Sequence, residues 1–244
     1  MKTKLKLLSC LFILILFSCE SAYINTSKNI MYGGANKSIN LYAFVGEKIS
    51  VTEFDPNEKN EKGEKFGYEI DEETGDSLKV TTKHYIMDRA FKCKYRVLRK
   101  MFNYLEADTV EFVAYDHYGT PGFAESDSVI LYLSKNKEKG YYFHQKYQYD
   151  KVYQNKKGHY YSYPKFNGNE SLQTIQNMTA FDANFSNEKF DISHLDDANV
   201  KMYYNSKFYK IEGNYAIPVK GIYLNQLINY RLHTTFKNLN LNIQ

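Results

Sequence analysis

Side chains that perform acid–base or metal chemistry are few in this 244-residue chain, and they are widely spaced. No two of the six histidines have the short spacing that places a pair of zinc ligands on one helix face, and no closely spaced cysteine pair joins them. The chain also lacks a glycine-rich phosphate loop and a dinucleotide-binding fingerprint. We therefore predict no metal site and no cofactor, and a binding or structural role in preference to an enzymatic one.

One short segment does place an acid beside a base. Asp116, His117 and Tyr118 follow one another where a predicted strand runs into the Gly/Pro-rich segment 119–122, and loops at strand ends often carry functional residues. Neighbouring residues of a strand point to opposite faces, so Asp116 and His117 diverge unless the strand ends there. They are candidate residues of a ligand-binding site or of an envelope hydrolase, with a polar strand end as the alternative.

Tyrosine is the second feature that suggests a site, because the chain has 24 Tyr and 16 Phe but no Trp. Residues 141–149 interleave aromatic and polar side chains, as a half-buried strand does. Two faces are expected: a core face of Tyr141, Phe143, Tyr147 and Tyr149, and a solvent face of Tyr142, His144, Lys146 and Gln148. Tyr142 and His144 are therefore candidate binding residues, since a tyrosine ring offers an apolar face and a hydroxyl to a glycan or protein ligand. Ordinary packing of the sheet is the alternative.

Other strands must position these residues. The clearest runs from Phe91 to Val97, where apolar side chains and Cys93 alternate with Lys92, Lys94 and Arg96. Cys93 is thus a core residue. Residues 110–115 and 129–133 are apolar on both faces, as in strands covered on both sides. Gly75 supplies the positive φ for a hairpin between two further short strands, 68–70 and 78–80.

The polar, tyrosine-rich segment 151–169 is the best candidate for a boundary between two regions. Beyond it, Asn169 is expected to cap a short helix, and apolar residues at helical spacing predict a final helix from Leu224 to Leu232. Short strands are expected at 200–204, 208–211 and 215–219. We therefore divide the chain after a tether at 19–40 into a β domain at 41–150 and a C-terminal α+β extension or second subdomain at 151–244.

The predicted fold class is mainly β: an antiparallel small barrel or a sandwich, with the smaller α+β region at the C-terminus. The pattern of strands 90–97, 108–113 and 128–133 is similar to that of netrin-like and metalloproteinase-inhibitor-like barrels, which belong to the OB class. The paired cysteines of the extracellular members are missing here. The resemblance therefore implies an OB-like barrel and does not imply inhibitor activity.

The first 19 residues carry a targeting signal. Lys2, Lys4 and Lys6 precede an apolar stretch from Leu7 to Phe17 that is too short to span a bilayer. Leu16-Phe17-Ser18-Cys19 resembles the lipobox of bacterial lipoproteins, with a branched aliphatic, a small residue and then cysteine. The resemblance implies a signal peptide at 1–18, cleavage before Cys19, and attachment of diacylglycerol and a fatty acid such as palmitate at Cys19.

The charge that remains after such cleavage limits the partners. Loss of the three signal-peptide lysines lowers Lys and Arg from 32 to 29, against 28 Asp and Glu. This near-neutral balance does not favour nucleic acid. We expect a lipid-anchored envelope lipoprotein of a Gram-negative-type bacterium, at the outer membrane, that binds a protein or glycan. A lipoprotein that protects its owner by binding a toxin stays open as an alternative.

Overall fold

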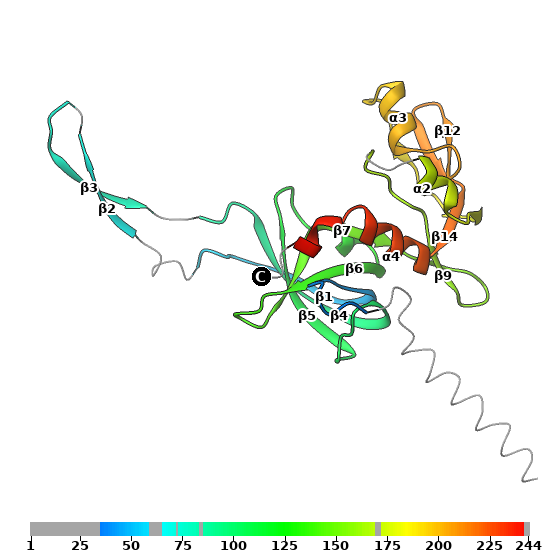
Figure 1. The fold of residues 1–244 in the computed structure, drawn as a ribbon, viewed down its shortest axis with the longest axis horizontal. Helices are drawn as coiled ribbons and strands as arrows, with labels where there is room; N and C mark the ends of the chain where they lie inside the picture. Colours follow the sequence, from blue (N-terminus) through cyan, green and yellow to red (C-terminus); the bar gives the residue numbers. More distant parts are fainter. Residues whose placement is uncertain (1–34, 59–64, 72, 83–84, 169–171, 242–244) are drawn as a thin grey trace, which may run out of the picture.

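The computed structural model describes residues 35–58, 65–71, 73–82, 85–168 and 172–241 (Figure 1). The predicted signal peptide, Cys19 and the expected helix cap Asn169 lie outside the described residues. The fold is mainly β, as predicted, with a barrel-like ring of strands followed by a smaller region of short strands and helices.

Five strands form the ring: β1 (Tyr42–Phe54), β4 (Arg89–Phe102), β5 (Thr109–Asp116), β6 (Ser128–Lys135) and β7 (Tyr142–Lys151). They pair in the order β1-β4-β5-β7-β6, and β6 pairs with β1. Every pair is antiparallel except β5–β7, which is parallel and joins only Phe112 to Tyr142 and Val113 to Phe143. Of the two predicted arrangements, a small barrel or a sandwich, the strands form the barrel-like ring, with one parallel contact that alternation did not predict.

The interior of the ring is filled by large side chains. On β4, Cys93 and Tyr95 point inward while Lys92, Lys94 and Arg96 are exposed, so the predicted alternation is confirmed. The 3-10 helix η2 (Gly122–Glu125) inserts Phe123, which is completely buried against Tyr95 and Phe112. Burial raises the pKa of the Cys93 thiol to about 12, so this cysteine is an unreactive core residue.

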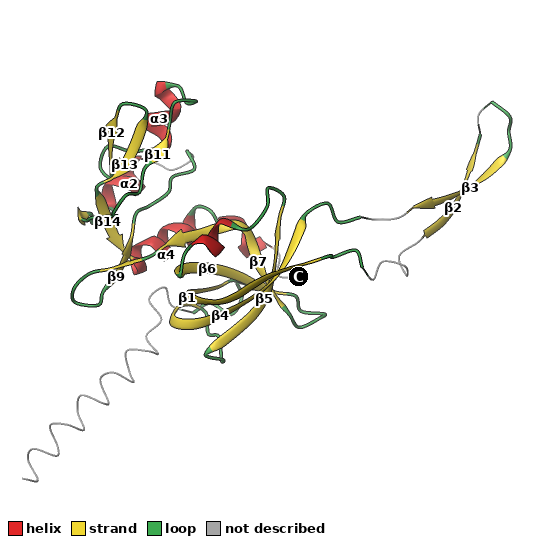
Figure 2. Ribbon diagram, turned by 180° about the vertical axis from the view of Figure 1, so that it is seen from behind, coloured by secondary structure: helices red, strands yellow, loops and turns green. Residues whose placement is uncertain are grey.

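The first part of β1, residues 43–46, and most of β6 are buried on both faces. Phe44 and Leu131 point into the ring, whereas Val45 and Ile130 point outward into a second apolar core. Helix α4 (Leu224–His233) covers that outer face with Leu227 and other buried side chains, and Figure 2 shows it alongside β6 and β7. The predicted two-sided burial is confirmed for residues 129–133 but is wrong for 110–115, where Glu111 is exposed and the outer face of β5 has no covering element. The predicted final helix is confirmed.

A buried ion pair connects α4 to the ring. Two guanidinium nitrogens of Arg231 on α4 donate hydrogen bonds to the carboxylate of Asp150 on β7. The Arg231 Nε lies 3.1 Å from Oδ2 of Asp150. Tyr132 of β6 donates its hydroxyl to the same carboxylate at 2.7 Å. Burial raises the pKa of Asp150, but the Arg231 guanidinium outweighs it and holds that pKa below its usual value. Asp150 is therefore charged inside the protein, and its charge depends on Arg231.

The C-terminal region contains two small sheets. One has the order β10-β14-β9-β8 and the other the order β11-β13-β12. Their strands are β8 (Tyr153–Gln154), β9 (Tyr160–Ser162), β10 (Phe181–Asp182), β11 (Phe190–Asp191), β12 (Tyr209–Glu212), β13 (Tyr215–Pro218) and β14 (Lys220–Tyr223). The remaining helices are α2 (Leu172–Asn177), α3 (Asp197–Tyr203) and the 3-10 helix η3 (Lys237–Leu241).

Helix α3 corrects one prediction. A strand was expected at 200–204, but α3 occupies this stretch because Asp196 caps it, accepting a hydrogen bond from the Asn199 backbone N–H at 2.8 Å. A short apolar run does not by itself distinguish strand from helix, and here the cap decides. Among the described residues, no helix combines the length and apolar character needed to cross a membrane.

A hairpin is inserted between β1 and β4. Its strands β2 (Lys65–Ile70) and β3 (Ser77–Thr82) stand away from the ring in Figure 1, and Gly75 in its turn has a φ of 73°, as predicted. At the base of the insertion, the side-chain amide of Asn57 bonds both backbone groups of Ile86, at 2.9 and 3.0 Å. Nearby, Arg89 pairs with Glu53. These contacts extend the β1–β4 pairing beyond the ring.

The ion pair predicts a large stability loss for Arg231→Met. The substitution leaves the Asp150 carboxylate buried without its counter-charge, which costs about 3–5 kcal/mol of unfolding free energy. Urea denaturation at pH 7 measures the loss. The triple variant Arg231→Met/Asp150→Leu/Tyr132→Phe also removes the unpaired carboxylate, so most of the stability is expected to return, apart from the attraction that Lys165 loses with Asp150. A triple variant as unstable as the single one would contradict this account.

Candidate functional site

Strand β7 carries a bulge that changes which of its residues face the core. Leu131 pairs with Tyr149, and Leu133 pairs with His144. An advance of two residues along β6 therefore corresponds to five residues along β7. Tyr147 lies in the bulge with a φ of 65°, a conformation that non-glycine residues rarely adopt. Tyr147 is 45% exposed and His144 only 7% exposed. The core positions predicted for Tyr147 and for Tyr141, which is 39% exposed, and the solvent position predicted for His144 are therefore wrong, because uninterrupted alternation was assumed.

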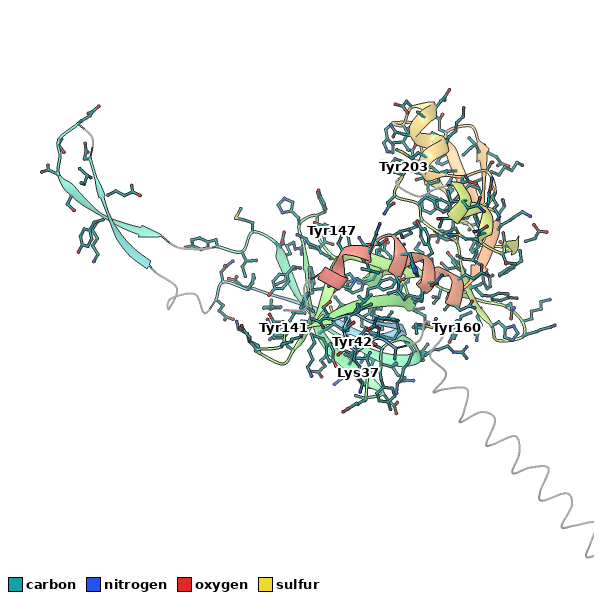
Figure 3. The ribbon with its side chains drawn as sticks, viewed as in Figure 1. Lys37, Tyr42, Tyr141, Tyr147, Tyr160 and Tyr203 are labelled. Atoms are coloured by element: carbon teal, nitrogen blue, oxygen red, sulfur yellow. The ribbon has the colours of Figure 1, made fainter. Side chains whose placement is uncertain are left out.

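Tyr142 lies between two hollows on the outer face of β4 and β5. The hollows measure about 440 and 620 Å³ and share Lys94, Glu111 and Tyr142 in their walls. We call their combined surface the β4–β5 groove. Tyr141 and Tyr42 also line it, on the opposite side of the ring from Tyr147 in the view of Figure 3. Of the four predicted site residues, Tyr142 alone lies in this groove.

The aromatic wall of the groove is held in place by its neighbours. The ring of Tyr142 meets that of Tyr42 edge to face, with centroids 5.3 Å apart. The Lys135 ammonium lies 5.6 Å from the Tyr142 ring centroid. Burial, together with Tyr42 and Glu106, raises the pKa of Tyr142, so its hydroxyl stays protonated at neutral pH and can donate a hydrogen bond. Tyr104, 53% exposed, adds an aromatic face at the far end.

The floor of the groove is polar. Lys94 on β4 and Glu111 on β5 form an ion pair of 2.9 Å across the strand boundary, and both side chains remain largely exposed. Ser50 and Thr52 of β1 add two hydroxyls beside Lys92. The groove thus combines aromatic faces with hydroxyls and charges of both signs.

Two other predicted site residues meet in a different place. Asp116 and His144 line a pocket of about 250 Å³ at the end of the ring, with η2 and four aromatic rings around it. We call it the mouth pocket; its lining residues are Asp116, Tyr118, Thr120, Pro121, Gly122, Phe123, His144, Tyr147 and Tyr149. His144 packs on the Phe123 ring at 4.6 Å between centroids.

His117 is turned away from this pocket. Its Nδ1 lies 3.3 Å from Asp88, which also accepts a 2.6 Å hydrogen bond from Lys146. Asp116 instead accepts a hydrogen bond from the backbone N–H of Tyr118 at 2.8 Å. Because β5 continues through Asp116, the two neighbours diverge and take different partners. They do not form the acid–base pair that a hydrolase at this position requires.

The groove contains residues that sequence reasoning missed, namely Tyr42, Tyr104, Lys135 and the Lys94–Glu111 pair. The exposed position of Lys94 follows from the alternation of β4. Its pairing with Glu111 depends on the register between β4 and β5, and no turn signal in the intervening segment defines that register. For this pairing, the only signal in the sequence was the presence of opposite charges on the solvent-exposed faces of consecutive predicted strands.

Comparison of the chain with protein families, with curated proteins and with solved structures finds no match. Among the described residues, no three His, Cys, Asp or Glu side chains gather where they could hold a metal ion. The case for a function therefore depends on the shape and chemistry of the groove and the mouth pocket.

The buried imidazole of His144 predicts acid sensitivity. Burial lowers the pKa of His144 from 6.5 to about 4, so between these values the unfolded chain binds the additional proton. Stability then falls as the pH falls, and this group contributes a loss of about 2 kcal/mol between pH 7 and pH 5. Urea unfolding of wild type and His144→Gln at both pH values measures the contribution. Equal pH dependence in the two proteins would show that His144 titrates normally.

Proposed function

We propose that this protein is a lipid-anchored binding protein of a Gram-negative-type envelope, and that it binds a glycan in the β4–β5 groove. The observation that carries the proposal is the combination in one groove of half-buried tyrosine rings with the exposed Lys94–Glu111 ion pair. The strand pair β4–β5 corresponds to the face through which OB barrels bind oligosaccharides and oligonucleotides.

Sugar chemistry suits the two kinds of surface in the groove. A pyranose ring has an apolar C–H face, which packs on a flat aromatic ring such as that of Tyr141 or Tyr142. Its hydroxyls both donate and accept hydrogen bonds. Glu111 accepts, Lys94 donates, and Ser50 on β1 does both. The Lys94–Glu111 pair can therefore donate to one hydroxyl and accept from a neighbouring hydroxyl of a stacked ring.

Two other ligand classes fit less well. A nucleic acid needs a clear excess of positive charge along its backbone, but Glu106 and Glu111 face the lysines of the groove. A peptide that binds by adding a strand needs a free strand edge. Strand β4 is hydrogen-bonded on both sides, to β1 and β5. Strand β5 pairs with β7 at Phe112 and Val113, so a peptide could add a strand only along the short stretch 109–111 of the groove.

The lipid anchor is proposed from the lipobox-like Leu16-Phe17-Ser18-Cys19 and the lysine-rich segment before it. Acyl chains on Cys19 would contribute about 0.8 kcal/mol per buried methylene, so two or three chains hold a protein firmly at a membrane. The predicted tether 19–40 would then link the anchor to the ring, where Asn36 and Asn40 at its end are hydrogen-bonded to Asn103 and Lys135.

Groove variants test glycan binding. Tyr142→Ala removes the stacking ring and is expected to weaken oligosaccharide binding at least tenfold, whereas Tyr142→Phe keeps the ring and most of the affinity. Tyr147→Ala is the matched control, because Tyr147 is an exposed tyrosine of the same strand outside the groove. A panel of soluble oligosaccharides titrated by calorimetry measures each affinity, and circular dichroism checks folding. Equal losses for Tyr142→Ala and Tyr147→Ala, or capture of a protein ligand alone, would contradict the proposal.

Cys19→Ala tests the anchor. Without the thiol no thioether to diacylglycerol can form, so the lipoprotein-specific peptidase has no substrate. We expect an uncleaved precursor that incorporates no labelled fatty acid, detected by mass spectrometry and metabolic labelling. Wild-type protein recovered processed but without lipid would rule out the lipobox interpretation.

A further inference from the structure

We propose that the mouth pocket binds a primary ammonium group, supplied by a free amine or by a lysine side chain of a partner. This site is separate from the β4–β5 groove. It takes a different chemistry, because its buried polar side chains are acceptors and its remaining wall is largely aromatic.

The pocket is built where β5 leaves the ring. Phe112, Ala114 and Asp116 alternate inward along β5, so Asp116 lies at the interior end of the strand and is 8% exposed. Phe123 of η2 closes the bottom. Gly122 allows the Tyr149 hydroxyl to enter, since a Cβ at this glycine would lie 2.5 Å from that oxygen. Mouths of β-barrels are common ligand sites.

His144 presents an acceptor to this space. Its Nε2 lies 2.8 Å from the Gln148 carbonyl oxygen, and because a carbonyl only accepts, Nε2 carries the ring proton. The imidazole is neutral at pH 7, since burial lowers its pKa to about 4. Nδ1 therefore has a free lone pair. Within the described part of the chain it makes no hydrogen bond, and it is not sealed from solvent, so it opens onto the pocket.

Asp116 supplies the negative charge. Its Oδ1 accepts a hydrogen bond from the Tyr118 backbone N–H. Among the described residues, none donates a hydrogen bond to the Asp116 Oδ2 atom. A carboxylate that is more than nine-tenths buried beside a neutral imidazole favours a ligand that brings both a positive charge and N–H donors. No Lys or Arg is among the residues that line the pocket.

The aromatic walls also accept cations. The Lys165 ammonium lies 4.6 Å from the ring centroid of Tyr149, and the Lys146 ammonium 5.2 Å from that of Tyr147, although neither lysine lines the pocket. Lys146 is paired with Asp88, which offsets its charge. Ammonium groups are attracted to such ring faces. Because Lys165 and Lys146 already lie against the rings of Tyr149 and Tyr147, the attraction for an added ammonium comes from Asp116 and the acceptor nitrogen of His144.

The test is a titration of the full chain in detergent with n-butylammonium, followed by the NMR signals of the His144 and Tyr149 rings. We expect saturable shifts with n-butylammonium and at least tenfold weaker binding of n-butanol, which has nearly the same shape without the charge. Nα-acetyl-lysine-N-methylamide separates the two sources. Tighter binding of this peptide mimic indicates a lysine side chain, and tighter binding of n-butylammonium indicates a free amine.

Two variants and one control keep the proposal falsifiable. Asp116→Asn should weaken n-butylammonium at least tenfold. Asp182→Asn makes the same charge change on a side chain that is 92% exposed, and should have no effect. If Asp116→Asn does not fold, Gly122→Ala replaces it, because its Cβ displaces Tyr149 without changing charge. Equal binding of n-butanol, or full n-butylammonium affinity in a folded Asp116→Asn or Gly122→Ala protein, would overturn the proposal.

Discussion

The Asp150 carboxylate is the charged link between the ring and α4, inside the apolar core that they share. Asp150 is completely buried, and it remains charged because Arg231 of α4, the nearby Lys165 and the Tyr132 hydroxyl of β6 stabilise the carboxylate. Burying a charge is expensive unless a partner is present, so β7 and α4 must come together for either to be stable in its place. Docking of the C-terminal helix is thereby linked to formation of the ring.

The position of α4 also determines which face of the ring is left for binding. The helix covers the outer side of β1 and β6, where Val45 and Ile130 are buried. The outer side of β4 and β5 has no such cover, and there Lys92, Lys94 and Glu111 meet solvent. One side of the ring therefore carries the second core, and the opposite side carries the groove.

Local periodicity correctly predicted the features that are determined within a single strand or helix. The wet lysines of β4, the core position of Cys93 and the final helix at Leu224 all follow from spacing alone. The bulge at Tyr147 did not, because the aromatic and polar side chains keep alternating through it. A bulge is defined by the partner strand, and no pattern within β7 reports it.

The groove and the mouth pocket were harder to predict for a similar reason. Tyr42, Lys94 and Tyr142 come from three strands, and their meeting depends on the strand order and the short parallel contact of β5 with β7. The mouth pocket depends on the bulge, which turns His144 inward towards Asp116. Tyr142 was predicted because alternation placed it on the solvent-facing side of 141–149, where a tyrosine ring and hydroxyl can meet a ligand.

The hairpin inserted between β1 and β4 has a thermodynamic consequence. The entropy lost on closing a flexible loop grows only with the logarithm of its length, so each doubling adds about 0.6 kcal/mol. In this protein the base of the excursion is already held by the Asn57 amide on Ile86 and by the Arg89–Glu53 pair. The part of the hairpin insertion beyond that base can therefore be lengthened, shortened or replaced with little loss in the free energy of unfolding of the barrel. This connection is thus a place where sequences can diverge.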